Sequence, residues 1–145
     1  MTTDGGWAVA WLLATGLHAG FQLTVTLVVY PAFRRVPAAA WSGFHDGHSR
    51  GIAPLVGVLY AGLLAAAAGV LVVGPRGPGL WLGLAGVGLA LATTALVAAP
   101  THGRLGDGPE PGLLRRLRCA DLVRTVGALL GVAGALLHLL GPAWA

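Results

Sequence analysis

The chain has 145 residues, of which 56% are hydrophobic and only 10% are charged, and its mean hydropathy is +0.78. A soluble domain of this length is usually about one quarter charged and could not bury so much apolar surface. The composition therefore argues against an ordinary soluble domain and favours an integral membrane protein.

Four apolar segments predict four membrane-spanning helices. They cover about residues 7–30, 52–73, 79–99 and 122–140. Each is close to the ~20 residues that cross a ~30 Å hydrocarbon layer as a helix, and backbone groups in lipid must be bonded within their own segment. We predict one domain, residues 1–145, folded as an all-α bundle of four transmembrane helices.

The basic residues predict the orientation of this bundle. All nine are arginine, and seven lie between spans one and two or between spans three and four: Arg34, Arg35, Arg50, Arg104, Arg115, Arg116 and Arg118. The positive-inside rule then places these segments in the cytoplasm and both termini outside a cell (inner or plasma) membrane. The net charge of +4 indicates contact with anionic lipid headgroups rather than with nucleic acid.

The first predicted span carries a stripe of polar residues. His18, Gln22 and Thr26 share one helix face, and His18 lies near the bilayer centre. An ionisable residue at that depth is a functional hypothesis, and an interhelical hydrogen bond is the alternative. Gly16 and Gly20 flank His18 and predict the close approach of a neighbouring helix.

The segment WSGFHDGHSR, residues 41–50, precedes the second span. If it is helical, one face holds Trp41, Phe44, His45 and His48. Its glycines also allow a bent, re-entrant element. Two histidines three positions apart can direct both rings at one point, as in helical metal sites. Hydrogen bonding to lipid headgroups is the alternative role for both.

Further polar residues should reach the same side of the membrane. His102 ends the third span, and Asp121 and Arg124 begin the fourth on one helix face, where they can pair. Burying either charge in lipid is unfavourable unless it is paired or wetted, so both should face the bundle interior. Three imidazoles and a carboxylate suit iron, copper or zinc, and the predicted metal ligands are His45, His48, His102 and Asp121.

Small residues and helix breakers predict how the spans are joined. Gly79-xxx-Gly83 and Gly127-xxx-Gly131 fit the small-xxx-small pattern of close helix packing. The sequence GPRGPG predicts a tight turn between spans two and three. Residues 101–112 predict a loop, and the LLRRLR that follows predicts a basic amphipathic segment lying in the membrane interface.

Several motifs together resemble those of small four-span bacterial membrane proteins of unknown function. They are the first helix with Gln22 that ends in VVYPAF, then WSGFHDGHSR, PTHGRL and DLVRT, and they extend over essentially the whole chain. The resemblance implies that the polar residues belong to one site. The four spans and the Tyr-Pro end of the first helix are also distantly similar to the anthrone-oxygenase-like membrane family, some members of which oxidise polycyclic phenols with dioxygen.

Two functional hypotheses follow. In the first, the chain is a membrane oxidoreductase or oxygenase-like enzyme on a lipid-soluble substrate, with histidines that bind a metal or act as acid–base groups. Its catalytic residues would be His45, His48, Asp121 and Arg124. In the second, it is a non-enzymatic scaffold, or a small transporter or accessory subunit, whose Gly-rich faces contact a second copy or a larger membrane partner. The polar stripe of the first span would then line a proton or solute path.

Overall fold

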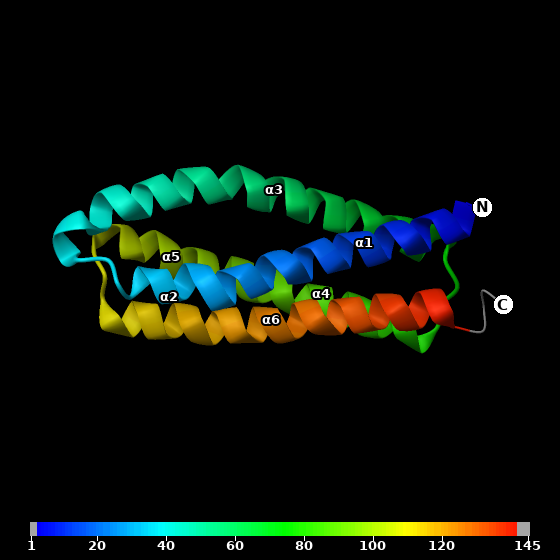
Figure 1. Ribbon diagram of the computed structural model, residues 1–145. Helices are drawn as coiled ribbons and strands as arrows, with labels where there is room; N and C mark the ends of the chain where they lie inside the picture. Colours follow the sequence, from blue (N-terminus) through cyan, green and yellow to red (C-terminus); the bar gives the residue numbers. More distant parts are fainter. Residues whose placement is uncertain (1–2, 142–145) are drawn as a thin grey trace.

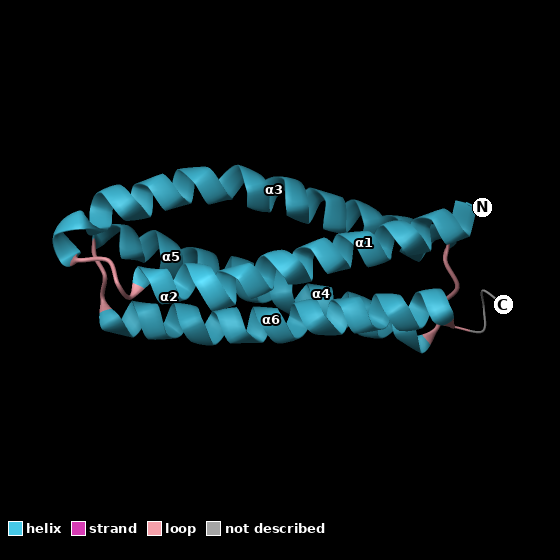
Figure 2. Ribbon diagram, in the orientation of Figure 1, coloured by secondary structure: helices cyan, strands magenta, loops and turns pink. Residues whose placement is uncertain are grey.

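The computed structural model is a bundle of long helices (Figures 1 and 2), and it describes residues 3–141. The long helices are α1 (Thr3–Thr24), α3 (Trp41–Val73), α4 (Pro78–Thr93) and α6 (Pro111–Leu140). The beginning of α1 and the end of α6 lie at the same end of the bundle. The other residues of the predicted domain, 1–2 and 142–145, lie outside the described part of the chain.

Short helical elements lie between the long helices and occur in the same order, a π-helical turn, a short α-helix and a 3-10 turn, in the first and second halves of the chain. In the first half, η1 (Val25–Val29), α2 (Tyr30–Phe33) and η2 (Ala38–Ala40) lie between α1 and α3. In the second half, η3 (Thr94–Ala98), α5 (Ala99–Arg104) and η4 (Leu105–Asp107) lie between α4 and α6.

The two π-helical turns, η1 and η3, have a common cause in the sequence. Each ends just before a proline, Pro31 or Pro100. A proline has no N–H and its ring clashes with the carbonyl group four residues earlier, so a regular α-helix cannot continue unchanged. The helix widens instead, and the N–H groups of Tyr30 and Ala99 bond to carbonyl oxygens five residues back.

Four continuous helical stretches are long and apolar enough to cross a membrane: Gly5–Phe33, Ala38–Val73, Pro78–Asp107 and Pro111–Leu140. This confirms the four predicted apolar helices. The helices extend beyond the predicted spans, however. The segment WSGFHDGHSR is the regular beginning of α3 and not a re-entrant element.

The predicted loop at residues 101–112 is shortened to residues 108–110, and LLRRLR is part of α6 and not a separate segment. Helical structure reaches Asp107, and α6 begins at Pro111 and runs unbroken through LLRRLR. Proline is favoured in the first turn of a helix. In addition, Leu113 and Leu117 are buried in one apolar cluster with Phe33 of α2 and Trp41 of α3. The burial of these leucines therefore holds the basic segment LLRRLR in the bundle as the first turns of α6.

Two apolar clusters form the core, one toward each end of the bundle. Trp11, Leu63 and Leu80 belong to the first, and Phe33 and Trp41 to the second. The buried polar and charged residues between them are Thr15, His18, Gln22, Asp121 and Arg124. The middle of the bundle is therefore polar inside.

The α4–α6 contact is built on glycine. A Cβ atom added to Gly134 would lie 2.1 Å from the backbone nitrogen of Gly83, and one added to Gly86 would lie 2.6 Å from the carbonyl oxygen of Gly127. No side chain fits between the two backbones at these positions, so the helices approach each other closely. The small-xxx-small patterns of the third and fourth spans therefore belong to a helix–helix contact, as predicted.

The glycines of the first span behave differently. A Cβ atom added to Gly16 or Gly20 would meet nothing within 4 Å. The expectation that a neighbouring helix packs closely against them is therefore wrong, since no helix in the described range, residues 3–141, approaches either glycine. The physical reason is the rotation of α1, which turns this face, together with Leu13 and Leu17, outward from the bundle.

Candidate functional site

Histidines from two helices meet at the end of the bundle where α3 begins and α5 ends. His45 Nε2 lies 3.1 Å from His102 Nδ1 and 3.2 Å from the carbonyl oxygen of His102. The ring of His48 stacks on that of His102, with centroids 5.6 Å apart. The structure thus brings the three predicted histidines side by side.

Aromatic side chains hold this histidine group in place. The indole N–H of Trp41 donates to the carbonyl oxygen of Leu105 over 2.6 Å, and the Trp41 ring stacks on His45. The ring of Phe33 meets His48 edge-on, with centroids 4.9 Å apart. These contacts fix the polar, glycine-containing first turns of α3 against α2 and η4.

One assignment of the ring protons satisfies both contacts of His45 Nε2. A carbonyl oxygen only accepts hydrogen bonds, so His45 Nε2 carries a proton when it bonds to the carbonyl of His102. The same N–H then faces His102 Nδ1, which must accept, and the neutral His102 ring carries its proton on Nε2. This Nε2 is buried and has no hydrogen-bond partner among residues 3–141. With this assignment, His102 presents an unpaired donor.

The predicted metal site receives no support from this arrangement. Within the described residues, no group of three or more His, Cys, Asp or Glu side chains is placed to hold a metal ion. The predicted fourth ligand, Asp121, belongs to a separate network with α1. Iron, copper or zinc is therefore not assigned to these side chains.

That second network joins α1 and α6 through Gln22. Its side-chain N–H donates to Asp121 Oδ1 over 2.5 Å, and Arg124 Nη2 donates to Gln22 Oε1 over 2.9 Å. Arg124 Nη1 also donates to the hydroxyl of Tyr30 over 3.4 Å. Asp121 and Arg124 both face the interior as predicted, but the bonds between them run through the amide of Gln22.

The predicted polar stripe on α1 is divided between two neighbours. Thr26 Oγ1 lies 2.8 Å from Thr125 Oγ1 of α6, close to the Gln22 network. The fully buried ring of His18 instead meets Tyr60 of α3 edge-on, with centroids 5.6 Å apart. Neither ring nitrogen of His18 has a hydrogen-bond partner in the part of the chain that the structure describes.

A cavity of about 120 Å³ lies between the histidine group and the Tyr30–Arg124 end of the Gln22 network. Its polar lining comes from five elements and consists of Tyr30, His48, Tyr60, Thr94, His102 and Arg124. The remaining walls are apolar, among them Phe21, Val25 and Ile52. A larger apolar groove of about 710 Å³ runs between α1 and α3 and is also lined by Phe21.

Two tyrosines of this cavity were missed in the sequence. Tyr60 lies inside an apolar span, where its hydroxyl group needs a hydrogen-bond partner. This requirement could have identified Tyr60 as part of a polar site from the sequence. Its hydroxyl lies 3.0 Å from Thr94 Oγ1. Tyr30 was noted only as the end of a helix. Its bond to Arg124 depends on the pairing of α1 with α6, which no local pattern shows.

The fold and the site define a class of protein: a bundle of four helices of membrane length with a small cavity lined by polar and apolar side chains. Comparison with protein-family models found no match, and comparisons with curated proteins and with solved structures found no significant one. The similarity to anthrone-oxygenase-like proteins therefore gains no support, and no residue role is taken from it.

Proposed function

We propose that this protein binds a small lipid-soluble molecule, a ring that carries a carbonyl or hydroxyl oxygen, in the cavity beside His48 and His102. The observation that carries the proposal is the buried Nε2 of His102, a residue that lines this cavity, because this nitrogen has no hydrogen-bond partner among residues 3–141. An unpaired buried donor is unfavourable, and a ligand oxygen would satisfy it. Metal binding is not needed for this role.

The two hollows suit a ligand with a compact head and an apolar tail. A cavity of about 120 Å³ is close to the ~150 Å³ that holds a benzene molecule in an engineered apolar site. The apolar groove between α1 and α3 would take the tail, and Phe21 lines both hollows. A molecule dissolved in the bilayer could enter by this route between the two helices.

The paired histidines support proton transfer to such a ligand. If His102 Nε2 gives its proton to the ligand oxygen, His102 Nδ1 takes one from His45 Nε2, 3.1 Å away. His45 Nδ1 then takes up a proton from solvent, so both rings stay neutral, and the ligand oxygen that receives the proton, a phenolate or enolate oxyanion, becomes a hydroxyl group. The membrane oxidoreductase hypothesis of the sequence is retained here only as acid–base chemistry on a lipid-soluble substrate.

The proposal includes an orientation in the membrane. The arginine-rich end of the bundle would face the cytoplasm of a cell (inner or plasma) membrane, with both termini on the opposite side. The histidine cavity would then open near the cytoplasmic leaflet, because WSGFHDGHSR and the end of α5 lie at that end of the bundle.

A binding measurement with a decyl-substituted benzoquinone tests the proposal. We expect the detergent-purified protein to bind it in isothermal titration calorimetry, and His48→Ala to weaken binding roughly fivefold through the loss of about 1 kcal/mol of polar contact. Ser49→Ala is the matched control, because Ser49 is adjacent on α3 but does not line the cavity. Equal affinity of the His48→Ala variant, or equally tight binding of decylbenzene, would refute the proposal.

One observation favours the alternative, a scaffold that contacts another membrane chain. Gly16 and Gly20 form an open face that no residue in the described range 3–141 covers. If a second copy packs there, Gly16→Leu/Gly20→Leu should weaken self-association in detergent at least tenfold by analytical ultracentrifugation. Gly88→Leu is the control, since Gly88 is equally open on α4. A monomeric wild-type protein, or equal association of both variants, would contradict this alternative.

A further inference from the structure

A second cavity with different chemistry lies where α2 ends and α6 begins. Its volume is about 370 Å³, and three arginines line it: Arg34, Arg115 and Arg118. Tyr30, Phe33 and leucines of α6 supply the rest of its walls, and no acidic side chain is among the residues that line it. It shares Tyr30 with the histidine cavity, and Phe33 also contacts His48, but its three arginines are not used in the function proposed above.

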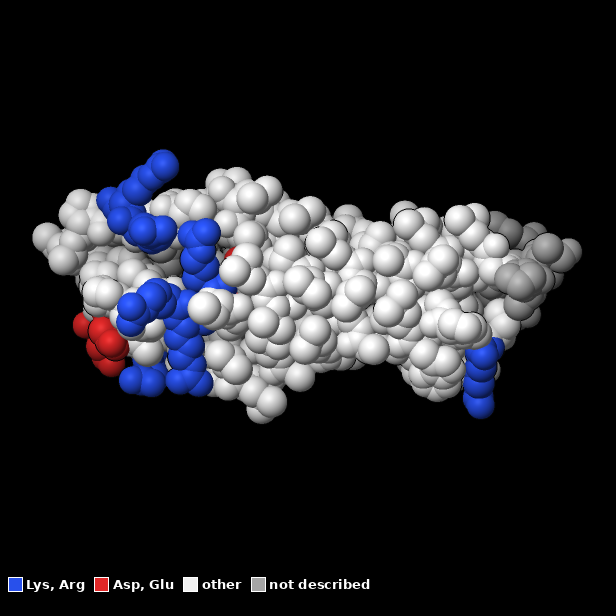
Figure 3. Space-filling model, turned by 90° about the horizontal axis from the view of Figure 1, so that it is seen from below, with Lys and Arg blue, Asp and Glu red and all other residues white. Residues whose placement is uncertain are grey.

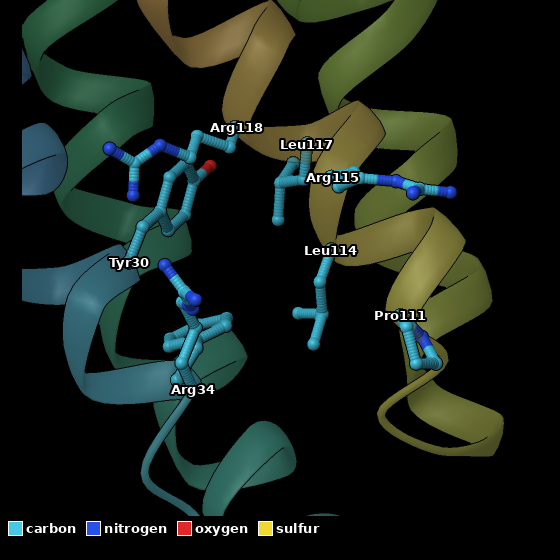
Figure 4. Close-up of a pocket in the computed structure, with 8 residues that line it drawn as sticks. Tyr30, Arg34, Pro111, Leu114, Arg115, Leu117 and Arg118 are labelled. Atoms are coloured by element: carbon cyan, nitrogen blue, oxygen red, sulfur yellow. The ribbon is translucent and has the colours of Figure 1, made fainter.

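The arginines approach the cavity from two different helices. In Figure 4, Arg34 at the end of α2 and Arg118 on α6 extend on the side of Tyr30, and Leu114 and Leu117 form the facing wall. Arg115 extends from α6 on the other side. All three arginines are exposed residues, so a ligand can reach their guanidinium groups from outside the bundle.

The location fits the boundary between lipid and water. Figure 3 shows that Lys and Arg side chains, all of them arginine here, gather near one end of the molecule, while the long middle carries almost none. The cavity is lined by three of these arginines and by apolar side chains, so it lies where the charged end meets apolar surface. A ligand there would meet cationic groups on one side and hydrocarbon on the other.

The repeat of the two halves supports a binding role for this place. Arg115 and Arg118 lie four and seven positions after the first residue of α6, as His45 and His48 do after the first residue of α3. In the same way, Phe33 follows Pro31 by the spacing with which His102 follows Pro100. Each site thus combines the end of one short helix with the first turns of a long helix, with imidazole in one site and guanidinium in the other.

We infer that this cavity binds the phosphate group of an anionic phospholipid of the cytoplasmic-side leaflet, with Arg34 and Arg118 as the phosphate ligands. Guanidinium groups match phosphate oxygens in bidentate geometry and stay charged at every physiological pH. The apolar walls from Phe33, Leu114 and Leu117 would contact the first carbons of the acyl chains. Free inorganic phosphate would gain nothing from those walls, and this favours the lipid.

Native mass spectrometry of the protein released from detergent micelles tests this inference, with dioleoylphosphatidylglycerol as the probe. We expect Arg34→Gln/Arg118→Gln to weaken the one-to-one lipid complex at least roughly 25-fold, since the loss of each direct guanidinium–phosphate hydrogen bond corresponds to about a fivefold or larger change in the binding constant. The matched control is Arg35→Gln/Arg116→Gln, which removes the same charge from neighbouring positions that do not line the cavity. Its affinity should stay within about twofold of wild type.

Each other outcome has a definite meaning. Equal losses in the two double variants would show diffuse attraction to the basic end and would overturn the inference, as would no loss in either. Displacement of the lipid by millimolar inorganic phosphate would assign the cavity to a free phosphate instead. Equally tight binding of dioleoylphosphatidylcholine would exclude recognition of the anionic charge. Thermal unfolding of each variant provides the folding check, because all four arginines are exposed.

Discussion

Replacing Gly134 by alanine is expected to lower the free energy of unfolding by about 3 kcal/mol. The added Cβ would lie 2.1 Å from the backbone nitrogen and 2.4 Å from the Cα of Gly83. A flexible side chain could move aside, but a backbone cannot, so α4 and α6 must separate and lose contact along their length. Equilibrium unfolding in mixed detergent micelles measures the change.

The control for this experiment is Gly88→Ala on α4. A Cβ at Gly88 meets nothing within 4 Å, so alanine adds helix propensity without a clash. We expect Gly88→Ala to be neutral or to stabilise the protein by up to about 1 kcal/mol. Loss of stability of similar size in both variants would show that the close α4–α6 contact is not what limits substitution at Gly134.

Replacing Gln22 by leucine is expected to destabilise the protein by a similar amount, about 3 kcal/mol. The amide of Gln22 donates to Asp121 and accepts from Arg124, so its loss leaves a buried carboxylate and a buried guanidinium each without one partner. Charged groups that lose a partner inside an apolar bundle are strongly unfavourable. The same detergent unfolding measurement applies.

Two further variants separate this effect from simple loss of packing. Thr24→Val removes only a bond between an exposed hydroxyl and the carbonyl of Gly20 in the same helix, and should change stability by less than about 0.5 kcal/mol. Replacing Gln22, Asp121 and Arg124 together by leucine or methionine should recover most of the stability lost in Gln22→Leu, because no charge then remains buried. A triple variant less stable than Gln22→Leu would contradict the proposed role of the network.

The sequence indicated the location of the histidine group better than its chemistry. The spacing of His45 and His48 correctly placed them on one side of a helix, and the end of the third span placed His102 at the same level. The expected convergence of Asp121 on them did not follow, because rotation of α6 directs its carboxylate to Gln22 on α1. The fourth metal ligand was inferred from depth alone, and depth does not specify the direction in which a side chain points.

The sequence by itself determined the four apolar helices and the glycine contact between the third and fourth spans. Both follow from local rules: backbone groups in lipid must bond within their own helix, and only small residues allow two helix backbones to touch. The tertiary structure alone decided that α3 and α6 begin as regular helices, that Gly16 and Gly20 face outward, and that Gln22 separates Asp121 from Arg124. These features depend on the rotation and axial offset of each helix. Both are set by the packing of all four helices together, so no local sequence pattern predicts them.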